Sequence, residues 1–175
     1  MNALILVDIQ NDFLPGGALA VPGGDQVIPV ANRLALENEL VIATQDWHPD
    51  GHSSFSIWPP HCVENTKGAQ FAPDLDTNAI HYVFQKGTDP AIDSYSGFFD
   101  NDHKKSTGLG DFLKSMNVDA VTILGLATDY CVKFTALDAR QLGFDVTLIK
   151  SGCRGIGDET AAIEEMRRAG VKIES

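Results

Sequence analysis

Residues 44–55 read TQDWHPDGHSSF and gather several groups that bind metal ions. Asp46 and His48 are two positions apart, so on an extended segment their side chains point to the same side. His61 follows in WPPHCV, and His52 lies between them as a fourth candidate. A carboxylate with two imidazoles suits Zn²⁺, Fe²⁺ or Mn²⁺ and leaves positions open for water or substrate. Histidines in loops are often not ligands, so the spacing alone leaves a metal site and a metal-free loop equally open.

Cys131 is the candidate nucleophile. It comes near the start of a predicted helix over residues 128–143, directly after the apolar run 120–127. The positive end of a helix dipole lowers the pKa of a thiol, and exposed amides at the same turn could bind an oxyanion. The alternative is a buried cysteine that serves as a small apolar residue, which is the commoner fate of this residue type.

Two charged residues, Asp8 and Lys86, end apolar runs that are typical of buried strands. A charge at such a place is costly unless it is paired or functional. Next to a reactive cysteine, Asp8 could act as the base that activates the thiol, and Lys86 could keep that base ionised. A structural ion pair that fixes the end of the sheet is the alternative.

The elements that would position these residues alternate between strand and helix. Short, β-branched apolar runs predict buried parallel strands over residues 3–8, 40–46, 80–86, 120–127 and 145–151, with a sixth in the final VKIE. Helical spacing appears over residues 24–38, 108–118, 128–143 and 157–170. This order predicts an α/β fold with a doubly wound, mostly parallel six-stranded sheet and helices on both faces. In such sheets ligands bind at the carboxyl ends of the strands, where all the candidate residues lie.

The segment 47–79 is rich in proline, histidine and tryptophan and has little periodicity. A loop of this length in a compact domain is usually functional or disordered, and its aromatic residues argue against disorder. We therefore expect an ordered functional loop.

Composition limits the function classes. The chain has 175 residues, which suits one domain over residues 1–175, and its net charge of −11 argues against nucleic acid or an anionic membrane as partner. No apolar run is long enough to span a bilayer, and the first residues lack the basic start of a signal peptide. We expect a cytoplasmic protein, a monomer or homo-oligomer, whose three cysteines are free thiols and whose partner is a small molecule.

The chain resembles the nicotinamidase/pyrazinamidase branch of the isochorismatase-like cysteine hydrolases, and the similarity runs through nearly its whole length. The similar segments occur in the order ALILVDIQNDFLPGGALAVPGGD, TQDWHPDGHSSF with WPPHCV, VFQKGTDPAIDSYSGFFD, GLATDYCVKFTALDA and SGCRGI. The strings DWHP, WPPHCV and TDYCV are specific to the nicotinamidase branch. The resemblance implies the isochorismatase-like fold and hydrolysis of nicotinamide to nicotinate and ammonia through a cysteine thioester.

The resemblance also implies a role for each candidate residue. The catalytic triad would be Asp8, Lys86 and Cys131. The ligands of one divalent metal, zinc first and iron or manganese as alternatives, would be Asp46, His48 and His61. His52 would be a supporting residue or an occasional ligand.

The substrate pocket is implied in the same way. Phe13 and Trp58 would flank a pyridine ring held by the metal, and Tyr95 would line the same pocket. The backbone amides of Ala127 and Cys131 would form the oxyanion hole, next to a cis peptide bond between Leu126 and Ala127.

The sequence leaves two other functions open. One is a related cysteine amidohydrolase that acts on another small carboxamide, carbamoyl or ureido compound. The other is a metal- or ligand-binding module with an inert cysteine. Rates of ammonia release from a panel of amides would distinguish the related amidohydrolase from a nicotinamidase. The reactivity of the Cys131 thiol would distinguish the binding module from an enzyme.

Overall fold

A computed structural model describes the whole chain from Met1 to Ser175, and its centre is a six-stranded sheet. The strand order is β3-β2-β1-β4-β5-β6, and every neighbouring pair is parallel. The strands are β1 (Asn2–Val7), β2 (Val41–Asp46), β3 (Tyr82–Lys86), β4 (Ala120–Leu126), β5 (Asp145–Arg154) and β6 (Lys172–Glu174). The predicted six-stranded sheet is confirmed, and it is parallel throughout.

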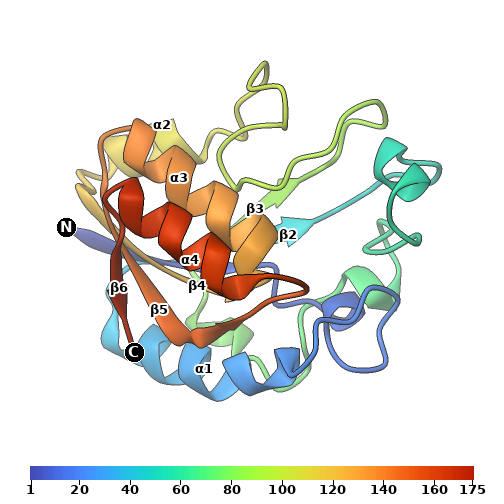
Figure 1. Cartoon of the computed structure of the whole chain (residues 1–175), viewed down its shortest axis with the longest axis horizontal. Coiled ribbons are helices and arrows are strands. Elements are labelled where there is room, and N and C mark those ends of the chain that lie inside the picture. Colours follow the sequence, from blue (N-terminus) through green and yellow to red (C-terminus); the bar gives the residue numbers. More distant parts are fainter.

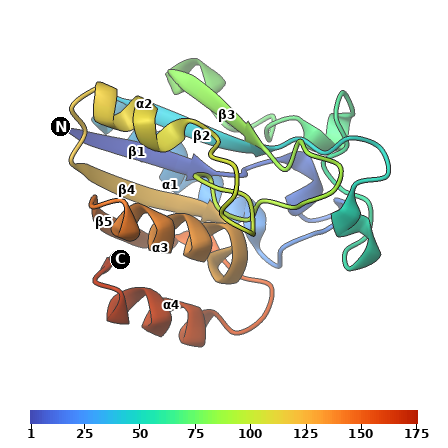
Figure 2. The same cartoon turned by 90° about the horizontal axis from the view of Figure 1, so that it is seen from above.

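Helices cover both faces of this sheet, as predicted (Figure 1). Helix α1 (Val27–Glu37) packs against β1, β4 and β5 on one face. The opposite face carries α2 (Leu109–Ser115), α3 (Lys133–Gln141) and α4 (Glu159–Arg168), as Figure 2 shows. Of these, α3 and α4 pack against each other. The helix expected over residues 128–143 is divided, because a π-helical turn at Thr128–Val132 precedes α3.

The order of the strands reverses between β1 and β4. The chain passes outward from β1 through β2 to β3 and then returns to place β4 on the other side of β1. Open α/β sheets bind ligands in the crevice that such a reversal leaves at the carboxyl ends of the strands. Gly125 allows β4 to approach β1 here, because its φ is 134° and a Cβ would overlap the backbone of Val7.

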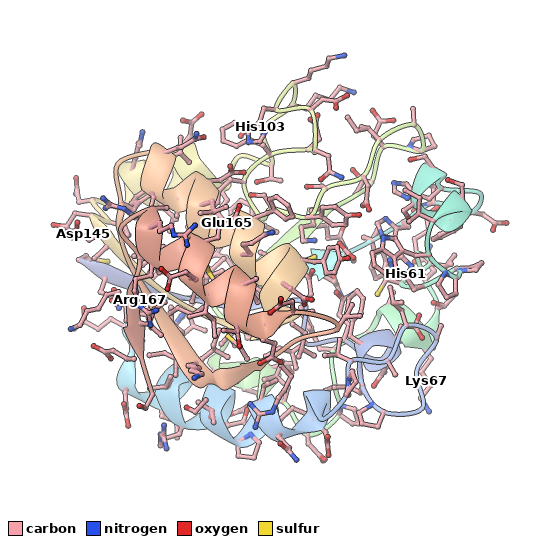
Figure 3. The ribbon with its side chains drawn as sticks, in the orientation of Figure 1. His61, Lys67, His103, Asp145, Glu165 and Arg167 are labelled. Atoms are coloured by element: carbon pink, nitrogen blue, oxygen red, sulfur yellow. The ribbon has the colours of Figure 1, made fainter.

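The connection between β2 and β3, residues 47–81, is ordered but contains only short 3-10 turns, at Ser53–Ser56, Lys67–Ala69 and Thr77–Ala79. Several of its apolar side chains, among them Ala69 and Ala72, are buried in the hydrophobic core. Figure 3 shows His61 on this connection, at the end of the molecule toward which β2 points. None of the helices of the fold is long and apolar enough to cross a membrane.

Candidate active site

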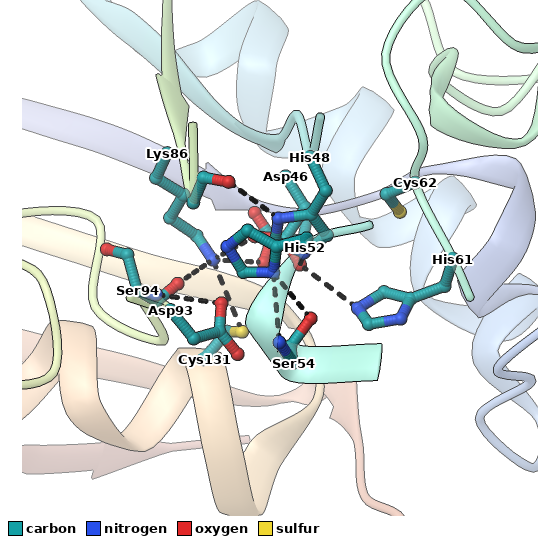
Figure 4. A network of polar contacts seen from close by, with 12 residues as sticks. Asp46, His48, His52, Ser54, His61, Cys62, Lys86, Asp93, Ser94 and Cys131 are labelled. Atoms are coloured by element: carbon teal, nitrogen blue, oxygen red, sulfur yellow. Dashed lines mark hydrogen bonds and ion pairs between the residues drawn. The ribbon is translucent and has the colours of Figure 1, made fainter. Parts of the chain in front are cut away.

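The carboxyl ends of the four neighbouring strands β3, β2, β1 and β4 bring together one amine, two carboxylates and one thiol. These groups belong to Lys86, Asp46, Asp8 and Cys131, respectively, and Figure 4 labels Lys86, Asp46 and Cys131. Lys86 Nζ lies 2.9 Å from Asp8 Oδ2, 2.6 Å from Asp46 Oδ1 and 3.4 Å from Cys131 Sγ. It also donates to the carbonyl oxygen of Ser94 at 2.8 Å. The side chain of Lys86 is fully buried, so this ammonium exchanges its hydration shell for two carboxylates, a carbonyl and the thiol.

Asp8 follows β1 directly and has a φ of 51°, which turns the chain and its carboxylate at the end of the sheet. Its Oδ1 accepts a hydrogen bond from Thr44 Oγ1 at 2.7 Å. Its Oδ2 is paired with Lys86 but accepts no directed hydrogen bond, so a lone pair is free to take a proton. Burial raises the pKa of Asp8 to about 6, against the opposing effect of the Lys86 charge. A carboxylate with this pKa is ionised at neutral pH and still basic enough to accept a proton.

Lys86 stays charged in this environment. Burial alone would lower the pKa of its ammonium, but the carboxylates of Asp46 and Asp8 raise it above the ordinary value for lysine. The site therefore holds one fixed positive charge, against which both carboxylates can remain ionised.

Cys131 lies in the π-helical turn that follows β4, and its thiol is buried. The prediction of a lowered thiol pKa at the helix start is wrong for the protein without substrate. Burial and the two nearby carboxylates raise the pKa of Cys131, although Lys86 opposes them. The resting thiol is therefore protonated. A carboxylate oxygen of Asp8, one of Asp46 and the Cys131 sulfur all lie within 4.8 Å of one another, so a base is within reach of this proton.

A second cluster, formed by Asp46, His48 and His61, adjoins the first through Asp46. Asp46 Oδ2 lies 3.5 Å from His48 Nε2 and 3.9 Å from His61 Nε2, and the three atoms all lie within 4.8 Å of one another. The charge of Lys86 lowers the pKa of Asp46 despite the opposing effect of burial, so this carboxylate is ionised.

The histidine tautomers in this cluster fit a divalent cation. The Nδ1 atoms face carbonyl oxygens, of Gly87 at 2.7 Å for His48 and of Pro59 at 2.8 Å for His61. A carbonyl can only accept, so each neutral ring carries its proton on Nδ1 and leaves a lone pair on Nε2. His48 Nε2 is buried without any hydrogen-bond partner, which is costly unless a ligand occupies that position. The spacing of one carboxylate and two imidazoles suits a divalent metal.

His52 is not part of this ligand group. Its ring stacks on the ring of His48 with centroids 4.1 Å apart. Its Nδ1 contacts Ser54 Oγ at 2.7 Å, and its Nε2 lies 3.2 Å from the carbonyl oxygen of Ile92. Both ring nitrogens of His52 therefore have hydrogen-bond partners of their own, and the ring packs against one face of the His48 ring.

A pocket connects the two clusters to the surface. Its lining includes the three predicted pocket residues Phe13, Trp58 and Tyr95 together with His61 and Cys131. Trp58 Nε1 donates to Tyr95 Oη at 3.2 Å, which ties two walls of the pocket to each other.

Sequence reasoning missed several residues of this pocket and of the framework around it. The further lining residues include Leu19, Asp93, Tyr130 and Ile156. All four lie inside the segments that resemble the family. Adjacency to Cys131 is the signal that could have identified Tyr130. Thr44, whose hydroxyl donates to Asp8, also lies in a similar segment, but nothing in the sequence indicates this contact.

The backbone turns sharply at the end of β4. The peptide bond between Leu126 and Ala127 is cis. Ala127 and Cys131 both line the pocket, at the two ends of the turn that follows the strand.

The chain is similar to known proteins over nearly its whole length. A family model described as the isochorismatase domain matches residues 2–175. The nicotinamidase of Escherichia coli (strain K12) is 48% identical over 199 residues, which cover 98% of this chain and 93% of that protein. The structure of PnC1 from L. infantum in complex with nicotinate has a TM-score of 0.95 and 40% identity, covering 99% of this chain and 91% of that one. The pyrazinamidase of Pyrococcus horikoshii in complex with zinc has a TM-score of 0.89 and 44% identity, covering 98% of this chain and 97% of that one.

Proposed function

This chain belongs to the isochorismatase family, and we infer that it is a nicotinamidase that hydrolyses nicotinamide through a thioester on Cys131. The products are nicotinate and ammonia. The observation that carries the mechanism is the position of Lys86 Nζ, 3.4 Å from the thiol and paired with both carboxylates, next to a pocket lined by aromatic residues and by Cys131 itself.

Acylation begins with proton transfer from the Cys131 thiol to Asp8. The free lone pair of Asp8 Oδ2 and the raised pKa of its carboxyl support this role. Lys86 stabilises the thiolate as it forms, because its ammonium lies 3.4 Å from the sulfur. The thiolate attacks the carboxamide carbon, and the backbone amides of Ala127 and Cys131 donate to the oxygen that becomes negative.

Collapse of the tetrahedral intermediate breaks the C–N bond. Asp8 returns its proton to the leaving nitrogen, so ammonia departs as a neutral molecule and Cys131 carries the acyl group. Asp8, ionised again, then takes a proton from a water molecule that attacks the thioester. The C–S bond then breaks, the proton on Asp8 passes to the Cys131 sulfur, and the carboxylic acid loses its own proton to the solvent. Nicotinate and the regenerated thiol thus complete a reaction that consumes one water per amide.

Asp46, His48 and His61 would hold the metal, and the orphaned His48 Nε2 supports this assignment. A bound divalent cation would supply a Lewis-acid position that fixes the pyridine nitrogen of the substrate. We propose zinc as this metal, because the ligand set suits it and the similar pyrazinamidase was solved with zinc; iron and manganese suit the same set. Phe13, Trp58 and Tyr95 would enclose the ring.

Ammonia release from nicotinamide by wild-type protein and two cysteine variants tests this proposal. Cys131→Ala removes the nucleophile and should abolish turnover, while zinc content stays at the wild-type level. Cys153→Ala is the matched control, because Cys153 is also a buried thiol, with a pKa raised to about 12 by burial, and does not line the pocket. Turnover by Cys131→Ala would refute the covalent mechanism, and a wild-type protein that prefers a ureido compound to nicotinamide would refute the substrate.

A further inference from the structure

The side chain of Gln10 is fully buried beside Asp46, and both of its amide hydrogens and its amide oxygen are hydrogen-bonded. Its Oε1 accepts from the backbone nitrogen of Asp46 at 2.9 Å, and its Nε2 donates to the carbonyl oxygen of Asp46 at 2.8 Å. The second hydrogen of Nε2 goes to the carbonyl oxygen of Ala69 at 2.9 Å. The carboxamide thus binds both backbone groups of one proposed metal ligand.

The side chain of Gln10 binds the edge of β2 at a position where β1 no longer pairs with it. Strand β1 pairs with β2 only as far as Val7 and Thr44, because the left-handed conformation of Asp8 turns the chain away. On the other side, β3 still pairs with the end of β2, and Trp47 donates to the carbonyl oxygen of Lys86. The backbone groups of Asp46 that face β1 would therefore lack partners. A carboxamide carries the same donor and acceptor as a peptide group, so the Gln10 side chain continues the ladder for one residue.

The position of Asp46 matters because its two oxygens serve different groups. Oδ1 binds the Lys86 ammonium at 2.6 Å, and Oδ2 faces the Nε2 atoms of His48 and His61. A shift of the Asp46 backbone would move both oxygens together. Residues that orient a metal ligand from outside the ligand set commonly contribute a large part of the metal affinity.

We propose that Gln10 is a positioning residue that fixes Asp46 and thereby sets the metal affinity of the site. The proposal rests on the metal ligands of the proposed function. It assigns Gln10 no contact with substrate: the residue acts through the backbone of Asp46.

Gln45 offers a matched control. It is also a buried amide, adjacent to Asp46, and its Nε2 donates to the same Ala69 carbonyl at 3.1 Å. It makes no hydrogen bond to the backbone of Asp46, and its Oε1 accepts instead from Gln85. Gln10→Met and Gln45→Met therefore each remove a buried amide bound to Ala69, but only the first frees the backbone of Asp46.

Zinc affinity, measured by competition with a chromogenic chelator, tests the proposal in both variants and in wild-type protein. Gln10→Met should bind zinc roughly 10–100-fold more weakly than wild type, while Gln45→Met keeps the wild-type affinity. The melting temperature of each metal-free protein shows whether the variant is folded. If Gln10→Met does not fold, Gln10→Glu keeps the volume and the acceptor for the Asp46 nitrogen but leaves the Asp46 carbonyl without its amide donor, and it should show the same loss.

The outcomes separate this proposal from the proposed function. A folded Gln10 variant with wild-type zinc affinity would overturn the positioning role and leave the metal site standing. Equal losses in the Gln10 and Gln45 variants would also overturn it, because the effect would then be a general one of removing a buried amide. A wild-type protein without zinc affinity would overturn the metal assignment itself, and the positioning role with it.

Discussion

The ionisation of Asp8 should set the lower pH limit of activity. Burial raises the pKa of this carboxyl from 3.8 to about 6, and only the ionised form can take the thiol proton. Between pH 7 and pH 5 the ionised fraction therefore falls from about nine tenths to about one tenth, and kcat/KM should fall by about tenfold. An exposed aspartate would give no loss in this range, because it stays ionised to about pH 4.

The assay is steady-state ammonia release from nicotinamide across this range, with bound zinc measured at each pH because protonation of His48 and His61 would release the metal. Thr44→Val provides an internal check. It removes the hydroxyl that donates to Asp8 Oδ1 at 2.7 Å and stabilises the ionised form, so the acidic limit should move to higher pH. A wild-type profile that stays flat down to pH 5 with zinc still bound would refute Asp8 as a base with a raised pKa.

Three further changes test other parts of the structure. Lys86→Met leaves two buried carboxylates without their cation, so the free energy of unfolding at neutral pH, measured in urea, should fall by about 3–5 kcal/mol; an unchanged value would mean that the ion pairs add no net stability. Gly125→Ala places a Cβ against the backbone of Val7 at a φ of 134° and should lower the melting temperature strongly, whereas a wild-type melting temperature would contradict the close strand contact. His61→Ala should lose zinc while the metal-free protein melts as wild type does, and a full zinc content would remove His61 from the ligand set.

Strand ends were the part of the site that sequence could predict well. Asp8, Asp46 and Lys86 each end an apolar run, and parallel pairing places them together without knowledge of any side-chain contact. One carboxylate oxygen of Asp46 faces Lys86 and the other faces the two histidines. This arrangement could not be predicted from the sequence, because it depends on the direction in which each oxygen points. The sequence likewise predicted a lowered thiol pKa from the helix dipole, and burial of Cys131 reverses that direction.

The supporting residues could not be predicted for a different reason. Gln10 and Thr44 lie inside the segments that resemble the family, but their residue types are common on surfaces and nothing in the sequence shows which backbone or side-chain group each one contacts. Gln10 acquires its role only because Asp8 turns the chain away from β2. The orientation of His52 is similarly decided by Ser54 and the Ile92 carbonyl, which come from two separate segments.

The return of the chain from β3 to the far side of β1 has a consequence for folding kinetics. Asp8 and Cys131 meet across the β1–β4 pair, which joins the first strand of the chain to the fourth and cannot form until most of the polypeptide has been positioned. Pairings between such distant segments are slow to form, because the entropy of closing the loop is lost before the contact is gained. Recovery of enzyme activity during refolding should therefore lag behind helix formation, and a fragment that ends before β4 should have no partial activity.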